Sequence, residues 1–129
     1  MSTYQRCILI DDNEADNVFH EIMIRRAGFE GEVKVFESGI DALEFFEQDD
    51  AQIPTCIFLD INMPMMDGFE VANRLSPLLA TKPWVVLVML TSSGNPADKA
   101  RSEAISAIKG YVTKPLDVPT VKNVMGRTD

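Results

Sequence analysis

The chain has 129 residues, which predicts one domain over 1–129 with a single core and no attached output domain. With 46% apolar residues, no apolar run near the roughly 20 residues of a membrane-spanning helix and no secretory signal at its start, it is expected to be cytoplasmic. The formal net charge of -8 would repel a phosphate backbone and argues against direct binding to nucleic acid.

The first half of the chain alternates short apolar runs with segments of helical periodicity. Strands are predicted over 7–10, 33–36 and 56–59, and helices over 14–27 and 38–48. The first helix is predicted from four apolar residues at helical spacing: Ala15, Val18, Phe19 and Ile22. His20 lies among them and is expected to be a partly exposed structural residue. Ser38 is a suitable cap for the second helix.

The second half continues the alternation. Residues suited to helix capping open its three predicted helices: Asp67, Asn95 and Asp117. Pro77 is expected to end or kink the first of these helices, because it lacks an N–H and its ring clashes with the preceding turn. The run 84–90 is apolar throughout, as in a central strand covered on both faces, and 109–112 reads as a weaker fifth strand.

Five strands alternating with five helices predict an α/β fold, a doubly wound parallel sheet of five strands. The expected strand order is the flavodoxin-like 2-1-3-4-5. In that order Cys7 and Cys56 lie at the same depth on neighbouring strands. Because neighbouring strands are spaced wider than a relaxed disulfide requires, we expect two reduced, buried thiols.

Polar side chains follow four of the predicted strands. Asp11 and Asp12 follow the first strand, Asp60 the third, Thr91 the fourth and Lys114 the fifth. They should converge, because the carboxyl ends of parallel strands meet at one edge of the sheet. Two carboxylates about 4 Å apart repel by on the order of 4 kcal/mol at an effective dielectric of about 20. The lysine and a hard divalent cation such as Mg2+ are expected to offset that charge. In the alternative, purely structural interpretation, these acids only cap the helices that follow.

Four segments resemble the signatures of response regulator receiver domains. They are Ile-Leu-Ile-Asp-Asp at 8–12, Phe-Leu-Asp-Ile-Asn-Met-Pro-Met-Met-Asp-Gly at 58–68, Met-Leu-Thr-Ser at 89–92 and Tyr-Val-Thr-Lys-Pro at 111–115. Together they extend over nearly the whole chain in the order and spacing of that family.

The resemblance implies that Asp60 accepts a phosphoryl group from a sensor histidine kinase, a histidine phosphotransfer protein or a small donor. It implies that Asp11, Asp12 and Asp60 hold Mg2+ together with the backbone carbonyl of Asn62, and that Lys114 contacts the phosphoryl group. Such a protein is not an enzyme in the usual sense, since it catalyses only its own phosphorylation and dephosphorylation.

The resemblance also implies a switch. Thr91 matches the switch hydroxyl and Tyr111 the switch aromatic, whose inward rotation alters a partner-binding face over about 96–125. Asn62 and Ser93 match positions that tune the attack of water, and their small polar side chains predict a phosphoryl lifetime of minutes rather than days.

Three other interpretations fit parts of the sequence. A pseudo-receiver that binds partners without carrying phosphate would share the fold. An aspartate-nucleophile phosphatase also places a carboxylate after a strand, but it has a second acid two residues later, where this chain has Asn62. A flavodoxin would need a phosphate-binding loop after the first strand, where this chain has acids.

Overall fold

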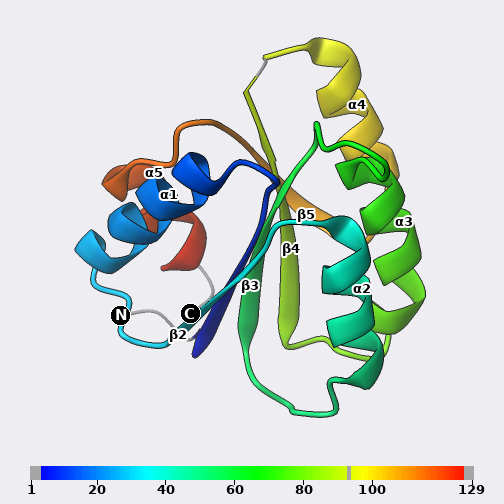
Figure 1. Cartoon of the computed structure of the whole chain (residues 1–129), viewed down its shortest axis with the longest axis horizontal. Coiled ribbons are helices and arrows are strands. Elements are labelled where there is room, and N and C mark those ends of the chain that lie inside the picture. Colours follow the sequence, from blue (N-terminus) through cyan, green and yellow to red (C-terminus); the bar gives the residue numbers. More distant parts are fainter. Residues whose placement is uncertain (1–3, 93, 127–129) are drawn as a thin grey trace.

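A computed structural model of the chain describes residues 4–92 and 94–126, in which five strands and five helices alternate (Figure 1). The strands are β1 (Arg6–Ile10), β2 (Glu32–Phe36), β3 (Thr55–Asp60), β4 (Val85–Thr91) and β5 (Ile108–Thr113). The helices are α1 (Glu14–Arg26), α2 (Gly39–Gln48), α3 (Gly68–Leu79), α4 (Pro96–Ala104) and α5 (Val118–Met125). Each described helix is too short or too polar to cross a lipid bilayer.

The strands form one parallel sheet in the order β2-β1-β3-β4-β5, which confirms the predicted topology. β1 and β3 are buried along their whole length, and their near-continuous apolar sequences suit strands covered on both faces. The edge strands β2 and β5 are partly exposed. The register pairs Asp60 with Leu90 and Thr91 with Thr113, so the polar ends of β3, β4 and β5 reach the same edge of the sheet.

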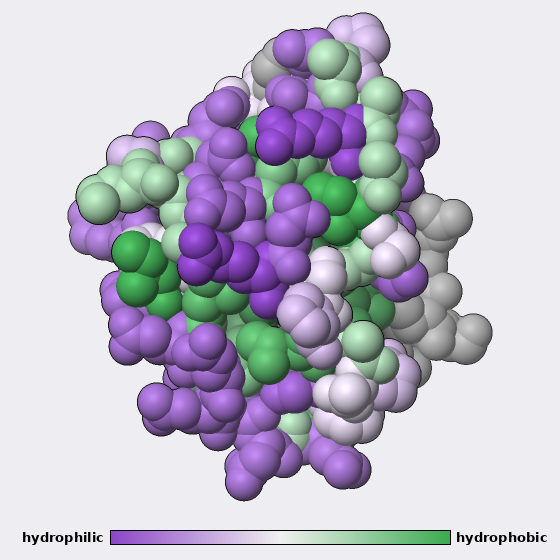
Figure 2. Space-filling model, turned by 90° about the vertical axis from the view of Figure 1, so that its right-hand side faces the viewer, coloured by the Kyte–Doolittle hydropathy of each residue, from purple (hydrophilic) through white to green (hydrophobic). Residues whose placement is uncertain are grey.

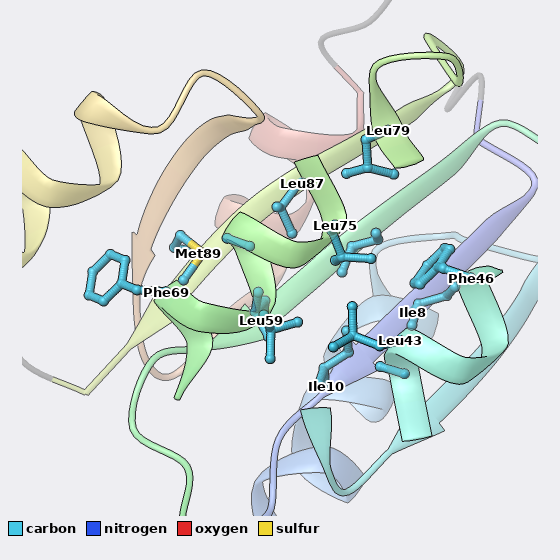
Figure 3. Close-up of a cluster of buried hydrophobic side chains, with 14 of the residues drawn as sticks. Ile8, Ile10, Leu43, Phe46, Leu59, Phe69, Leu75, Leu79, Leu87 and Met89 are labelled. Atoms are coloured by element: carbon cyan, nitrogen blue, oxygen red, sulfur yellow. The ribbon is translucent and has the colours of Figure 1, made fainter. Parts of the chain in front are cut away.

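Helices cover both faces of the sheet. α1 and α5 lie on one face, and α2, α3 and α4 on the other (Figure 1). Under α2 and α3, side chains such as Phe46 and Leu75 meet Ile8, Leu59 and Leu87 from the central strands (Figure 3). A second cluster, which includes Met23, Ile24, Val121 and Met125, fills the space under α1 and α5. Seen from outside, the layer of α2, α3 and α4 is mostly hydrophilic, with hydrophobic residues in small patches (Figure 2).

α1 buries a different face from the one that its apolar residues suggested. Three of those residues are substantially exposed: Val18 (56%), Phe19 (42%) and Ile22 (43%). The residues that α1 buries are Asn17, His20, Met23 and Ile24. The expectation that His20 is partly exposed was therefore wrong, since it is 2% exposed. The side-chain amide of Asn17 donates to the carbonyl of Asp11 (2.8 Å), and this bond turns the Asn17–His20–Ile24 face toward the sheet.

The helix caps follow the prediction, and of the two outcomes predicted for Pro77, an end of the helix at that residue is not observed. The side chains of the four predicted capping residues accept backbone N–H groups at the starts of α2, α3, α4 and α5: Ser38, Asp67, Asn95 and Asp117. Pro77 does not end α3, which continues to Leu79. It lies in the last turn, where it removes a single hydrogen bond to the carbonyl of Asn73.

Cys7 and Cys56 are register partners on β1 and β3 and are fully buried as free thiols, as predicted. Burial raises the pKa of both thiols, because the thiolate is poorly solvated in the core. Both residues are packing elements of the core under α1 and α5.

Candidate functional site

Three carboxylates meet at the carboxyl edge of the sheet. Asp11 and Asp12 follow β1, Asp60 ends β3, and one carboxylate oxygen from each lies within 4.8 Å of the other two. Asp11 and Asp60 are only 2% and 4% exposed, whereas Asp12 is open to solvent. Carboxylates this close, two of them withdrawn from water, require compensating positive charge. We call Asp11, Asp12 and Asp60 the acidic cluster.

Hydrogen bonds from β2 and α1 fix the position of Asp11. Its backbone N–H donates to the carbonyl of Phe36 (3.0 Å), and its own carbonyl accepts from the Asn17 amide. Its Oδ1 accepts the backbone N–H of Asn13 (2.9 Å). The carboxylate is thereby held before any ligand arrives.

Asp60 is fixed by the close approach of α3 to the end of β3. The N–H of Ile61 donates to the carbonyl of Leu90 (3.1 Å), and the N–H of Gly68 donates to the carbonyl of Ile61 (2.8 Å). A Cβ atom at Gly68 would lie 2.3 Å from the carbonyl oxygen of Asp60. Only glycine therefore lets α3 begin directly against the strand that carries the carboxylate.

Lys114, which directly follows β5, reaches the acidic cluster from two strands away, as the predicted convergence requires. Its Nζ lies 2.7 Å from Asp11 Oδ2, 2.8 Å from Asp16 Oδ2 and 3.2 Å from Asp60 Oδ1. Its backbone N–H donates to the carbonyl of Thr91 (2.6 Å), and the peptide bond to Pro115 is cis. One ammonium group thus serves three carboxylates.

Burial and the neighbouring charges shift the pKa values of Asp60 and Lys114. Burial, and after it the negative charge of Asp11, raises the pKa of Asp60 to about 6, even though Lys114 pulls in the opposite direction. Burial disfavours the ammonium of Lys114, but its hydrogen bonds to Asp11 and Asp16 and the charge of Asp60 outweigh burial and raise the pKa of Lys114. At neutral pH the site therefore carries an excess of negative charge around one fixed cation.

The predicted switch residues lie on β4 and β5. Thr91 ends β4 and is fully buried. Tyr111 pairs with Met89 in the β4–β5 register, is partly buried, and packs against the core under α2, α3 and α4. Asn62 is exposed in the loop after Asp60, and Ser93 lies outside the described residues.

The residues of the acidic cluster suit a hard divalent cation. Three carboxylates offer only oxygen ligands, and Mg2+ prefers a few carboxylates supplemented by water and phosphate oxygens. Burial and, after it, the negative charge of Asp11 raise the pKa of Asp60, and a bound cation would offset the second of these causes.

Asp16 is the site residue that the sequence did not identify. It lies in the first turn of α1, where acidic residues are common because they interact favourably with the helix dipole. Stabilisation of the helix was therefore a sufficient reason for an acidic residue at this position, and the sequence carried no sign of a role in the site. Its contact with Lys114 links residues 98 positions apart, and only the tertiary fold reveals it.

A family model described as the response regulator receiver domain matches residues 7–125. The chain belongs to the response regulator receiver family. Among curated relatives, "Chemotaxis protein CheY" of Halobacterium salinarum is 28% identical over 122 residues, which cover 94% of this chain and 93% of the relative.

Solved structures agree with this assignment. A response regulator receiver protein from Dyadobacter fermentans superimposes with a TM-score of 0.84 at 28% identity and covers 95% of each chain. A two-component response regulator from Cytophaga hutchinsonii gives a TM-score of 0.79 at 27% identity, covering 95% of this chain and 94% of its own.

This receiver domain accordingly belongs to two-component signalling, in which such domains interact with histidine kinases or phosphotransfer proteins. Receiver domains are typically signalling modules rather than enzymes, and they typically bind Mg2+. The phosphatase and flavodoxin interpretations are not favoured by these relationships.

Proposed function

We propose that this receiver domain accepts a phosphoryl group on Asp60 from the phosphohistidine of a sensor kinase or phosphotransfer protein, and signals by changing which proteins it binds. The observation that carries the proposal is one ammonium shared between the acceptor and its acidic neighbour. Lys114 Nζ lies 3.2 Å from Asp60 Oδ1 and 2.7 Å from Asp11 Oδ2. A transferring phosphoryl group carries negative charge, so a cation fixed beside the acceptor oxygen lowers the barrier.

In this reaction a carboxylate oxygen of Asp60 attacks phosphorus in line with the leaving imidazole. The new P–O bond forms as the P–N bond breaks, and the imidazole nitrogen keeps the electron pair of the broken bond. Mg2+, held by Asp11, Asp12, Asp60 and the carbonyl of Asn62, would neutralise charge on the phosphoryl oxygens. Lys114 supplies the fixed positive charge on the β5 side of the acceptor.

The output is a protein-binding face that includes α4, β5 and α5, over about 96–125. A phosphoryl group adds roughly -1.5 to -2 charges and strong acceptor oxygens, toward which the hydroxyl of Thr91 can donate. Hollows flank β5 on both sides: one of about 250 Å³ toward α4 and one of about 820 Å³ toward α5. Tyr111 lines both hollows, so rotation of its ring would change the shape of each.

The exposed apolar residues of α1 give the proposed kinase a docking face. Val18, Phe19 and Ile22 follow Asp16 on the helix that leads away from the acidic cluster. A phosphohistidine can reach Asp60 only if the partner covers the neighbouring surface. An apolar helix that carries the histidine would bury these three side chains as it presents its imidazole.

Incubation with acetyl phosphate and Mg2+, followed by intact-mass measurement, tests the proposal. We expect the mass of one phosphoryl group on the native chain and an unchanged mass for Asp60→Asn. The label should decay within minutes in Mg2+ and persist longer after chelation. No label on the native chain, or equal labelling of Asp60→Asn, would favour the pseudo-receiver, and a label that survives overnight in Mg2+ would contradict the role given to Asn62 and Ser93.

A further inference from the structure

Lys114 has three acidic neighbours, and one of them lies outside the acidic cluster. The Nζ of Lys114 donates to Asp16 Oδ2 at 2.8 Å, which is shorter than its 3.2 Å distance to Asp60 Oδ1. The carboxylates that group as potential metal ligands are those of Asp11, Asp12 and Asp60. Asp16 therefore binds the lysine without belonging to the set that would hold Mg2+.

Asp16 is held in place by the start of α1. Its backbone N–H donates to Oδ1 of Asn13, the residue that caps the helix (3.0 Å). The side chain of Asp16 is 38% exposed, compared with 13% for Lys114 and 5% for Asp60. Asp16 thus contacts the ammonium from a more exposed position than the buried carboxylates, and does so from a capped helix turn.

This arrangement matters because the lysine side chain is flexible. Four rotatable bonds connect the ammonium to the backbone, so the group needs a partner at each side to stay in one place. A cation on the acidic cluster would compete with Lys114 for the carboxylate of Asp11, which both would use. The contact with Asp16 involves no residue of that cluster and is free of this competition.

We propose that Asp16 is a positioning residue, which keeps the ammonium of Lys114 beside Asp60 so that it can meet the incoming phosphoryl group. The proposal rests on the proposed function of Asp60 and adds a residue to it. Asp16 itself touches no reacting atom and acts through Lys114.

The first test is the initial rate at which acetyl phosphate labels Asp60 at saturating Mg2+, with intact mass as the readout. Asp16→Asn keeps the shape of the side chain and removes its charge. Because partly exposed ion pairs contribute modestly, we expect the rate to fall about three- to fivefold. Glu14→Gln is the matched control, since Glu14 is an exposed acid in the same helical turn. Asp16→Glu, which keeps the charge, should recover most of the rate.

The second test needs neither Mg2+ nor phosphorylation. The unfolding of Asp16→Asn, Lys114→Met and the double variant is measured in chelator, together with the native chain. If Asp16 acts through the ammonium, the two substitutions are non-additive, whereas the pair of Glu14→Gln with Lys114→Met is additive.

The outcomes separate this proposal from the one on which it rests. An unlabelled native chain would overturn the role of Asp60. A labelled native chain with Asp16→Asn as fast as Glu14→Gln would overturn the role of Asp16 alone. Equal losses in Asp16→Asn and Asp16→Glu, or additive effects on unfolding, would also count against it, because they would point to a structural role in the helix turn.

Discussion

Replacing Asp60 by asparagine should stabilise the metal-free protein at neutral pH. The carboxylate of Asp60 is 4% exposed and faces two further acids, with one lysine to offset them. Burial and the charge of Asp11 raise its pKa to about 6, from an ordinary value of 3.8. Asparagine keeps nearly the same shape without the charge, so the substitution removes repulsion and leaves the packing in place.

The magnitude follows from linkage between ionisation and folding. A difference of one pKa unit corresponds to about 1.4 kcal/mol, so the raised pKa of Asp60 corresponds to a penalty of up to about 3 kcal/mol in the ionised native state. Below about pH 4 both folded and unfolded chains hold this proton, and the penalty is absent. Between there and pH 6 the unfolded chain loses the proton first, so native stability falls as pH rises. Above about pH 6 the full penalty applies.

Thermal or urea unfolding in chelator, run from pH 4.5 to pH 8, measures this difference. We expect Asp60→Asn to exceed the native chain by up to about 10 °C in Tm near pH 8, and the gap to close toward the acidic end. His20, whose pKa is lowered by burial and by the charge of Lys114, titrates in both proteins, so the difference between their curves isolates Asp60. Asp50→Asn, at an exposed carboxylate, should leave Tm unchanged.

Mg2+ should close the difference in Tm between Asp60→Asn and the native chain at every pH, because the cation removes the repulsion among the carboxylates. An Asp60→Asn variant that is less stable than the native chain in chelator at pH 8, or a difference that does not vary with pH, would refute this account of the site.

Two further substitutions probe the framework that holds the site. Arg6 pairs with Asp49 (2.9 Å) with side chains only 3% and 8% exposed, so Arg6→Met should cost about 3 kcal/mol in urea unfolding by leaving a buried carboxylate unpaired. Burial opposes the ionisation of Asp49, but the hydrogen bond and charge of Arg6 prevail and lower the pKa of Asp49. The loss of stability in Arg6→Met should therefore shrink as pH falls through the carboxyl range. A loss of stability that is constant with pH would argue against the pair. Gly68→Ala places a methyl group against the Asp60 carbonyl and should destabilise by about 1–3 kcal/mol and slow labelling, whereas Gly94→Ala, where a Cβ meets nothing within 4 Å, should do neither.

Much of the fold was predictable because its signals are local. Short β-branched runs, capping residues such as Asp67 and Asn95, and the alternation of elements were enough to predict a doubly wound parallel sheet, and the flavodoxin-like pattern supplied its strand order. The convergence of Asp11, Asp60 and Lys114 followed from that order, since parallel strands bring their carboxyl ends to one edge.

The errors concern α1, where helical periodicity did not identify the buried face. Val18, Phe19 and Ile22 are spaced as a packing stripe would be, yet the helix turns Asn17 and His20 inward. Asn17 faces inward and donates a hydrogen bond to the end of β1, and the spacing of apolar residues along a helix cannot reveal such a bond. The same rotation places Asp16 against Lys114, so the misjudged face and the missed site residue have one physical cause.

In the proposed switch, the packing of α4 would favour transmission of a charge added at Asp60 toward α4 and β5. Ser102 is the one buried residue among those described in α4, whereas α3 buries six. α4 also contacts α3 through the guanidinium of Arg101, which lies 4.3 Å from the ring centre of Phe69, a contact worth about 0.5–1 kcal/mol at an exposed site. A helix held this lightly lies at the low-stability end of the fold, from which moving elements are drawn. The strand of Thr91 leads into α4, so an inward shift of Thr91 would move α4 more easily than it would move α3, which is packed into the core.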